Sequence, residues 1–185
     1  MSKPIKGRCI AIIATDGIEQ SELETPRDVL RDAGARVDVI APRKHPIQGF
    51  RHRDKGQLVE VDAVIRDVDC IDYDALVIPG GLFNPDELRT DSDILDFTRA
   101  FFDACKPVAA VCHGPWVLIN AGVVKDRRMT SVPSIRQDLQ NAGAHWVDEE
   151  VVVDRGLITS RTPDDLDAFC SAIIKTLTED QDVDA

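Results

Sequence analysis

Hydrophobic residues along the chain gather in short continuous or alternating runs, which are separated by longer amphipathic segments. The short runs are typical of strands that are buried on one or both faces of a sheet. They predict strands over residues 8–14, 36–41, 75–78 and 107–111, an edge strand or hairpin arm over 58–65, and short extended pieces over 145–147, 151–153 and 157–159. The amphipathic segments predict helices over residues 21–33, 93–105, 115–121, 135–142 and 163–177. This alternation predicts βαβ units, and therefore an α/β fold with a mostly parallel sheet covered on both faces.

Glycine and proline residues divide these segments. Gly34, Gly122 and Gly143 each follow a helical pattern and are natural helix ends. Pro26 lies inside the first helical pattern, so we expect a kink or a late start there. Residues 42–56 are rich in basic and turn-forming residues.

The length and composition predict one globular domain. The chain has 185 residues, of which 43% are apolar, and a chain of this size can build a full hydrophobic core. We expect one domain over residues 1–178, followed by a frayed acidic tail over 179–185. No apolar run approaches the roughly 18 residues that cross a bilayer, and the apolar run over residues 9–14 is short for a signal peptide. We therefore expect a cytoplasmic protein without a membrane partner.

The net charge of −11 makes a direct nucleic-acid partner unexpected, because an acidic surface repels phosphate backbones. One basic cluster runs against this charge and could bind a polyanion, although a solvated loop or hairpin is the favoured interpretation. The cluster consists of Arg43, Lys44, His45, Arg51, His52, Arg53 and Lys55.

The five cysteines form no recognisable disulfide or zinc pattern. Their number is odd and no C-x-x-C pair occurs, which argues against a disulfide framework and a structural zinc site. We expect neither a metal nor another cofactor. Cys9, Cys70, Cys105 and Cys170 are interpreted as packing residues.

Cys112 differs from the other cysteines because it lies between a predicted strand and a predicted helix. Small residues flank it in the run Ala110-Val111-Cys112-His113-Gly114, as at the sharp turn of a nucleophile elbow. The positive end of the following helix would lower the pKa of the thiol. Free N–H groups at the helix start could also stabilise an oxyanion, and the adjacent His113 could transfer protons.

Other candidate residues follow the carboxyl ends of neighbouring strands, where ligands bind in open parallel sheets. The loops concerned are residues 15–22, 79–87 and 112–115. Gly80 and Gly81 could turn backbone N–H groups toward the site. Glu19 and Glu22, taken alone, would simply complement a helix dipole. The chain has no G-x-G-x-x-G or G-x-x-x-x-G-K motif, so nucleotide binding by these loops is not indicated.

Taken together, several motifs resemble the PfpI branch of the ThiJ/PfpI superfamily, in order from about Arg8 to Leu177. The matching segments are residues 16–23 (DGIEQSEL), 73–81 (YDALVIPGG), 111–115 (VCHGP), 130–131 (TS), 141–143 (NAG) and 160–166 (SRTPDDL). The resemblance implies a flavodoxin-like three-layer sandwich with a nucleophile elbow like that of class I glutamine amidotransferases. It also implies assembly into homodimers or larger rings.

The resemblance assigns a role to each site residue. It makes Cys112 the nucleophile, His113 its neighbouring base and Glu22 the acidic partner of the thiol, with backbone oxyanion donors among Gly80, Gly81 and His113. A protonated Glu22 would donate a hydrogen bond to the sulfur and stabilise the thiolate, whereas an ionised one would repel it. A carboxylate from a neighbouring subunit completes the family's triad, and Asp86 is chosen for this role over Glu87.

The function expected from these residues is that of a cytoplasmic stress-response cysteine hydrolase. Its substrates would be carbonyl compounds such as peptides or aldehyde adducts, attacked by Cys112. The alternative is a redox sensor or stress protein without turnover, in which peroxide oxidises Cys112. A glutamine-amidotransferase domain fits poorly, because His145 is the only later histidine and its spacing is wrong.

Overall fold

The computed structural model describes residues 3–183, and these residues contain a central seven-stranded sheet. The strand order is β11-β12-β8-β7-β1-β3-β6, and only β11 and β12 pair antiparallel. The prediction of a mostly parallel sheet is confirmed. The strands are β1 (Cys9–Ile13), β3 (Arg36–Ala41), β6 (Ala63–Val64), β7 (Ala75–Ile78), β8 (Val108–Val111), β11 (Val151–Asp154) and β12 (Leu157–Ser160).

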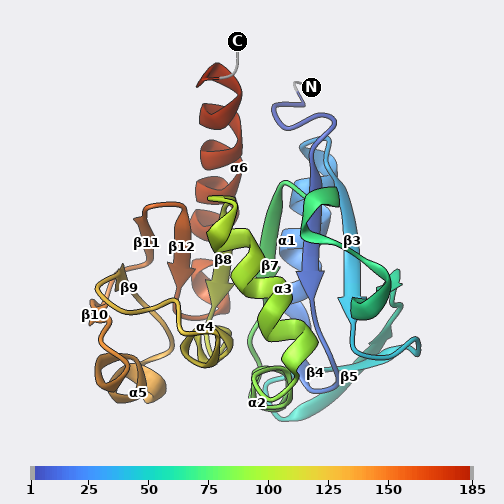
Figure 1. Cartoon of the computed structure of the whole chain (residues 1–185). Helices are drawn as coiled ribbons and strands as arrows, with labels where there is room; N and C mark the ends of the chain where they lie inside the picture. The colour runs from blue at the N-terminus through green and yellow to red at the C-terminus, as the bar shows by residue number, and fades with distance from the viewer. Residues whose placement is uncertain (1–2, 184–185) are drawn as a thin grey trace.

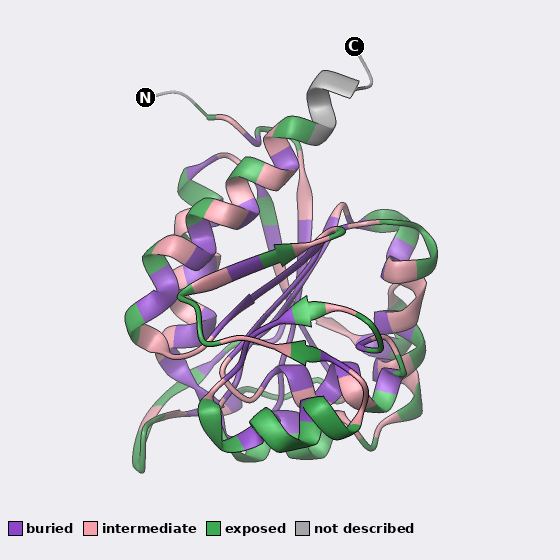
Figure 2. Ribbon diagram, turned by 90° about the vertical axis from the view of Figure 1, so that its left-hand side faces the viewer, coloured by how far each residue is buried: buried purple, intermediate pink, exposed green. Residues whose placement is uncertain are grey.

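Helices cover both faces of the sheet. One face packs against α1 (Gln20–Asp32) and α6 (Leu166–Val183), and the other against α3 (Ser92–Asp103), α4 (Pro115–Ala121) and α5 (Arg136–Asn141). Along β1, Ile10 and Ile12 contact the first layer while Ala11 and Ile13 contact the second. The strand therefore has to be apolar at every position, which explains its continuous hydrophobic run. Figure 2 shows the buried strands as a central layer between the helices.

The carboxyl ends of the parallel strands lie at one edge of the sheet, where short elements gather. Figure 1 shows α2 (Phe83–Leu88), α4 and the strands β4 (Ile47–Arg51) and β5 (Asp54–Val59) at this edge. The 3-10 turns η1 (Ile65–Asp67), η2 (Cys70–Asp72), η3 (Pro133–Ile135) and η4 (Pro163–Asp165) complete the connections. This is the edge at which an α/β sheet of this kind places its ligands.

The basic segment 42–56 forms part of a hairpin, which is one of the two interpretations that the sequence left open for the basic cluster. It contains β4, which pairs antiparallel with β5 and parallel with β2 (Ile18–Glu19) in a separate three-stranded sheet. Side chains from the start of α1 hold this hairpin, because Glu19 accepts from the His52 N–H at 2.8 Å and Gln20 from the Gln57 N–H at 2.9 Å. These contacts join residues far apart in the chain, so local sequence pattern did not reveal them.

Other boundaries also differ from the prediction. Helix α1 begins at Gln20 and runs through Pro26, and α2 forms within the expected loop 79–87. Helix α6 continues to Val183, past the expected boundary at residue 178, while residues 184–185 lie outside the described part of the chain. A short parallel pair, β9 (Arg128–Met129) and β10 (His145–Trp146), adds to the α5 side.

Within residues 3–183, no helix is both long and apolar enough to cross a membrane.

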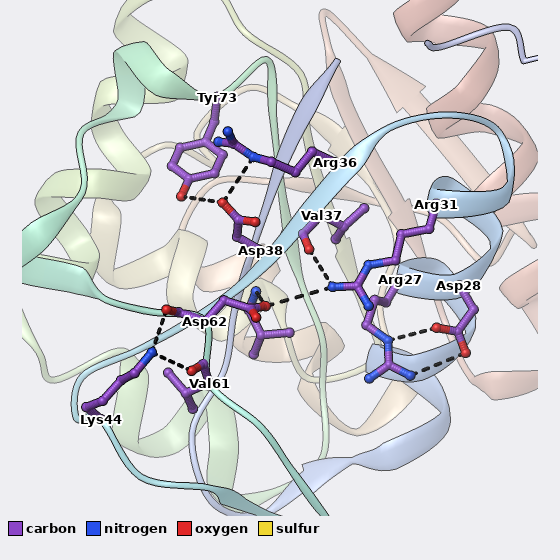
Figure 3. Close-up of polar contacts among 11 residues, drawn as sticks. Arg27, Asp28, Arg31, Arg36, Val37, Asp38, Lys44, Val61, Asp62 and Tyr73 are labelled. Carbon is purple, nitrogen blue, oxygen red and sulfur yellow. Dashed lines mark hydrogen bonds and ion pairs between the residues drawn. The ribbon is translucent and has the colours of Figure 1, made fainter. Parts of the chain in front are cut away.

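Side chains form hydrogen bonds with backbone groups at the outer edge of β3 (Figure 3). They are needed there because β6 pairs with only the last two residues of β3. The Asp62 carboxylate accepts from the Val39 N–H at 2.8 Å, and Arg31 donates to the Val37 carbonyl at 2.6 Å. Lys44 donates to the carbonyls of Val61 and Asp62 at 2.7 and 2.5 Å. The bonds to Val37 and Val39 use edge groups of β3 that would otherwise be free to pair with another strand, and the Lys44 bonds hold the segment that leads into β6.

We predict that Asp62→Ala lowers the free energy of unfolding by about 1–3 kcal/mol, because the buried Val39 N–H loses its acceptor. Chemical denaturation of the variant and of Glu60→Ala, an exposed neighbour, measures the difference. Equal losses in the two variants would contradict the prediction.

Candidate active site

Cys112 occupies the sharp turn between β8 and α4 with a left-handed backbone, at a φ of 60°. Its N–H donates to the Ser160 carbonyl at 3.1 Å, and its carbonyl accepts from the Val132 N–H at 3.0 Å. The conformation is costly for a residue with a side chain, and such strain concentrates at functional sites. The sequence prediction of an elbow is confirmed in its geometry, since Gly114 returns its N–H to the Val111 carbonyl at 2.8 Å.

Two glycines allow the loop after β7 to approach this turn. A Cβ on Gly114 would lie 2.5 Å from the Ile78 carbonyl oxygen. A Cβ on Gly80 would lie 2.5 Å from the Glu22 Oε2 and 2.8 Å from the Cys112 Cβ. All three distances are shorter than real Cβ contacts, so a side chain at either position would push the loops apart. This close approach brings Gly80, Glu22 and Cys112 into contact.

Glu22 reaches the same point from α1 and is fully buried. Its Oε2 accepts from the Gly80 N–H at 2.8 Å, and its Oε1 has no partner among the described residues. The carboxyl lies close enough to the Cys112 thiol for each group to shift the pKa of the other. Burial raises the pKa of this carboxyl to about 8, with a smaller contribution from Glu19, although the Gly80 N–H opposes the rise. Glu22 therefore keeps its proton at neutral pH and can act as a hydrogen-bond donor.

The Cys112 thiol has a raised pKa, which corrects the expectation that the helix start lowers it. Burial is the largest cause, followed by the charge of an ionised Glu22, while the N–H groups of His113 and Gly81 act in the opposite direction. The sequence gives no direct measure of this burial. When Glu22 holds its proton, the repulsion between the two groups disappears and the carboxyl supports the thiolate. The two groups are thus coupled, so that ionisation of one suppresses ionisation of the other.

His113 lies between the thiol and the surface. Its Nδ1 is 3.3 Å from the Cys112 Sγ and its Nε2 is 3.3 Å from the Ser134 Oγ. Burial lowers the pKa of the imidazole, so the ring is neutral at neutral pH and can accept a proton. The Trp116 ring packs beside it with centroids 5.2 Å apart.

Asp86 is the one predicted catalytic residue that the structure leaves outside this cluster. It lies on α2, is exposed, and accepts from Arg89 at 2.7 Å. Arg89 in turn lies 4.6 Å from the centre of the Trp116 ring, so Asp86 is linked to His113 only through Arg89 and Trp116. Among residues 3–183 no hydrogen bond joins Asp86 to His113. Glu87, the other option, also contributes no bond to the cluster.

Asn84, Ser134 and Trp116 are site residues that sequence reasoning missed. Asn84 is buried and joins two loops, since it accepts from the Thr15 N–H at 2.7 Å and donates to the Pro79 and Gly80 carbonyls at 3.0 and 3.2 Å. Its position shortly after Gly80-Gly81 was the only signal, and an asparagine there is equally typical of a plain turn. It fixes the loop that carries the glycines.

The glutamine-amidotransferase alternative finds no support in the contacts of residues 3–183. His145 lies in β10, and its side chain makes no hydrogen bond to Cys112 or His113. No group of three or more His, Cys, Asp or Glu side chains in this part of the chain is arranged to hold a metal ion.

We predict that Glu22→Gln stabilises the protein relative to wild type as the pH rises. An unfolded glutamate loses its proton near 4.5 whereas native Glu22 keeps it to about 8. Wild-type stability should therefore be intact below the lower value and fall between the two by about 1.4 kcal/mol per pH unit. Urea denaturation across this range measures the difference, with Glu24→Gln as the control on the same helix. Parallel pH dependence in wild type and Glu22→Gln would contradict the prediction.

Comparison with known proteins agrees with this geometry. The DJ-1/PfpI family matches residues 8–176. "General stress protein 18" of Bacillus subtilis is 46% identical over 164 residues, which cover 88% of this chain and 94% of that protein. "Putative cysteine protease YraA" of the same organism is 46% identical over 160 residues, covering 86% and 92%. "Protein/nucleic acid deglycase 2" of Escherichia coli is 43% identical over 169 residues, covering 91% and 96%.

Solved structures show the same fold. DJ-1beta of Drosophila melanogaster superposes with a TM-score of 0.85 at 30% identity, over 96% of this chain and 91% of that one. A ThiJ/PfpI domain protein from Brachyspira murdochii superposes with a TM-score of 0.86 at 21% identity, over 94% and 98%. With the family match over nearly the whole domain, the strained elbow cysteine and the buried glutamate beside it, the chain belongs to the DJ-1/PfpI family.

Proposed function

We propose that this protein is a cysteine-dependent hydrolase that acts on carbonyl compounds through Cys112. The observation that carries the proposal is the position of the Sγ, which lies at a strained turn, 3.3 Å from the His113 Nδ1 and against the N–H groups of His113 and Gly81. A nucleophile, a base and two backbone donors meet there within hydrogen-bond range. This is the set of groups that acyl transfer requires.

The reaction proceeds in two steps. The Cys112 thiol passes its proton to His113 as its Sγ forms a bond to the carbonyl carbon. The electron pair of the C=O bond moves to the oxygen, which the N–H groups of Gly81 and His113 stabilise. Collapse of this intermediate breaks the bond to the leaving nitrogen, which takes a proton from His113. Water, deprotonated by His113, then hydrolyses the enzyme-bound thioester and restores the thiol.

Glu22 acts as a positioning residue for the sulfur. While its carboxyl is protonated, it can donate a hydrogen bond to the thiolate, and its burial keeps it protonated to about pH 8. An ionised Glu22 would instead repel the thiolate. Attack at neutral pH therefore requires that the thiol gives its proton to His113 while Glu22 keeps its own.

Small or damaged substrates are favoured over folded proteins. Two relatives carry the names cysteine protease and deglycase. Peptides and aldehyde adducts have one reaction in common, which is the cleavage of a bond to a carbon that bears oxygen. The name general stress protein of a third relative supports a role under stress. Redox sensing uses the same thiol, but exposure does not favour it, because Cys105 is exposed whereas Cys112 is partly buried. That alternative stays a prediction.

A second copy of the chain completes the site in this proposal. Asp86 lies on the surface of α2, away from the His113 of its own protomer. Asp86 of the partner subunit would orient the His113 ring and stabilise its protonated form. Activity would then depend on assembly, and dilution to monomers would reduce it.

We predict that Cys112→Ala abolishes turnover of methylglyoxal and of peptide substrates, since it removes the nucleophile. Cys105→Ala removes an exposed cysteine outside the site and should retain turnover. Product formation is followed by absorbance and mass spectrometry. Undiminished turnover in Cys112→Ala would reject the mechanism.

We predict that inactive Cys112→Ala and weakened Asp86→Asn protomers recover activity when they are mixed and reassembled. A mixed assembly contains sites with Cys112 from one protomer and Asp86 from the other, so both groups are intact there. Glu87→Gln should retain activity without mixing. Mixtures no more active than their separate components would show that Asp86 does not act between subunits.

A further inference from the structure

A small apolar cavity lies beside the active-site cluster, between the tip of the β4–β5 hairpin and the start of α2. Its volume is about 260 Å³, and its walls include Gly17, Phe50, Arg53, Gly81, Leu82 and Phe83. Whole drug-sized ligands occupy about 300–1,000 Å³, so this cavity fits a single side chain or a comparable group.

Aromatic and aliphatic side chains form the cavity wall and leave apolar surface open to water. The rings of Phe50 and Phe83 lie 6.5 Å apart and are tilted by 60°. Phe83 remains 61% exposed and Leu82 54% exposed. Exposed neighbouring apolar groups that line a concave surface are typical of binding sites, because a ligand can bury what the fold leaves in water.

Gly81 connects the cavity to the nucleophile. Its N–H lies against the Cys112 sulfur, and the same residue lines the cavity. Its backbone is left-handed, with a φ of 84°, and an added Cβ would lie 2.4 Å from the Gly17 carbonyl oxygen. The loop is therefore pressed against residues 17–19. Gly81 therefore belongs both to the surroundings of the nucleophile and to the wall of the cavity.

The rim of the cavity carries a free positive charge. Arg53 is exposed at the hairpin tip and makes no ion pair among residues 3–183 whose side chains are described. Glu19 also lines the cavity. Its carboxylate is already engaged, since it accepts from the Ser21 hydroxyl at 3.2 Å and from the His52 N–H at 2.8 Å. Arg53 is thus available to a carboxylate of the ligand, which it can bind with two parallel hydrogen bonds.

We propose that this cavity is the subsite for the leaving group, and that it binds an apolar amino-acid residue whose free carboxylate pairs with Arg53. The inference rests on the proposed attack of Cys112 on a carbonyl carbon. It specifies the substrate class as N-acyl derivatives or aldehyde adducts of apolar amino acids, including the last residue of a peptide. The side chain packs between Phe50 and Phe83, and the carboxylate lies at the rim.

Iodoacetyl compounds test the subsite without requiring turnover. In each, the Cys112 sulfur forms a bond to the methylene carbon and iodide leaves. We expect N-iodoacetyl-phenylalanine to label Cys112 about tenfold faster than N-iodoacetyl-glycine, because the ring is buried on binding. It should also react several-fold faster than its own carboxamide. Peptide mass spectrometry gives the second-order rate constant at Cys112 for each compound.

Single substitutions separate the two parts of the site. Phe83→Ala should bring the phenylalanine-to-glycine ratio close to one, and Arg53→Gln should do the same for the acid-to-amide ratio. Ile71→Ala and Lys55→Gln are the matched controls, since they remove an exposed apolar residue and a hairpin charge outside the cavity. Both controls should keep both ratios.

The possible failures are distinguishable. If plain iodoacetamide leaves Cys112 unlabelled, the thiol is not a nucleophile, and the proposed function fails together with the subsite. If Cys112 reacts but the ratios are near one in wild type, only the subsite is wrong. A change of oligomeric state in Phe83→Ala, seen by size-exclusion chromatography, would also overturn the subsite, because the apolar patch would then be an interface between copies.

Discussion

The buried carboxyl of Glu22 is the group around which the functional edge of this protein is built. It accepts a hydrogen bond from the Gly80 N–H at 2.8 Å and lies beside Cys112, and it is fully buried. A carboxyl without water is costly to ionise, and this cost raises its pKa to about 8. The contact therefore ties α1, the loop after β7 and the elbow after β8 together through one protonated side chain. Any side chain on Gly80 would break this arrangement.

The same contact links stability to chemistry. A native carboxyl that must stay protonated costs stability as the pH rises, and the site retains it because a protonated acid beside a thiol supports a thiolate where an ionised one would oppose it. The strained backbone of Cys112 is a second local cost. The hydrophobic packing of the sheet against helices on both faces offsets both costs in stability. Gly81, the neighbour of Gly80, also lines the cavity beside Phe50 and Phe83 and so connects the nucleophile with the hairpin.

Sequence pattern predicted the sheet well because β1, β7 and β8 are apolar at successive positions. A strand that is apolar on both faces has to be buried between two layers. The sequence pattern also predicted the elbow, since Cys112 and Gly114 directly follow a buried strand that contains Ala110. It left a loop and a hairpin both open for the basic segment 42–56, because the strands β4 and β5 are mostly polar and are held by Glu19 and Gln20 from elsewhere in the chain. It also missed α2, where Gly81, Asn84 and Pro85 are as typical of a loop as of a short helix.

The sequence by itself therefore determined the α/β fold, the sharp turn at Cys112 and the identity of its immediate neighbour His113, because these depend on local periodicity and on residues adjacent in the chain. Only the tertiary structure decided the burial of Glu22, the raised pKa of the Cys112 thiol, the role of Asn84 and the cavity between Phe50 and Phe83. Burial and electrostatics depend on which distant segments exclude water from a group, and that information exists only once the loops after β1, β7 and β8 have met.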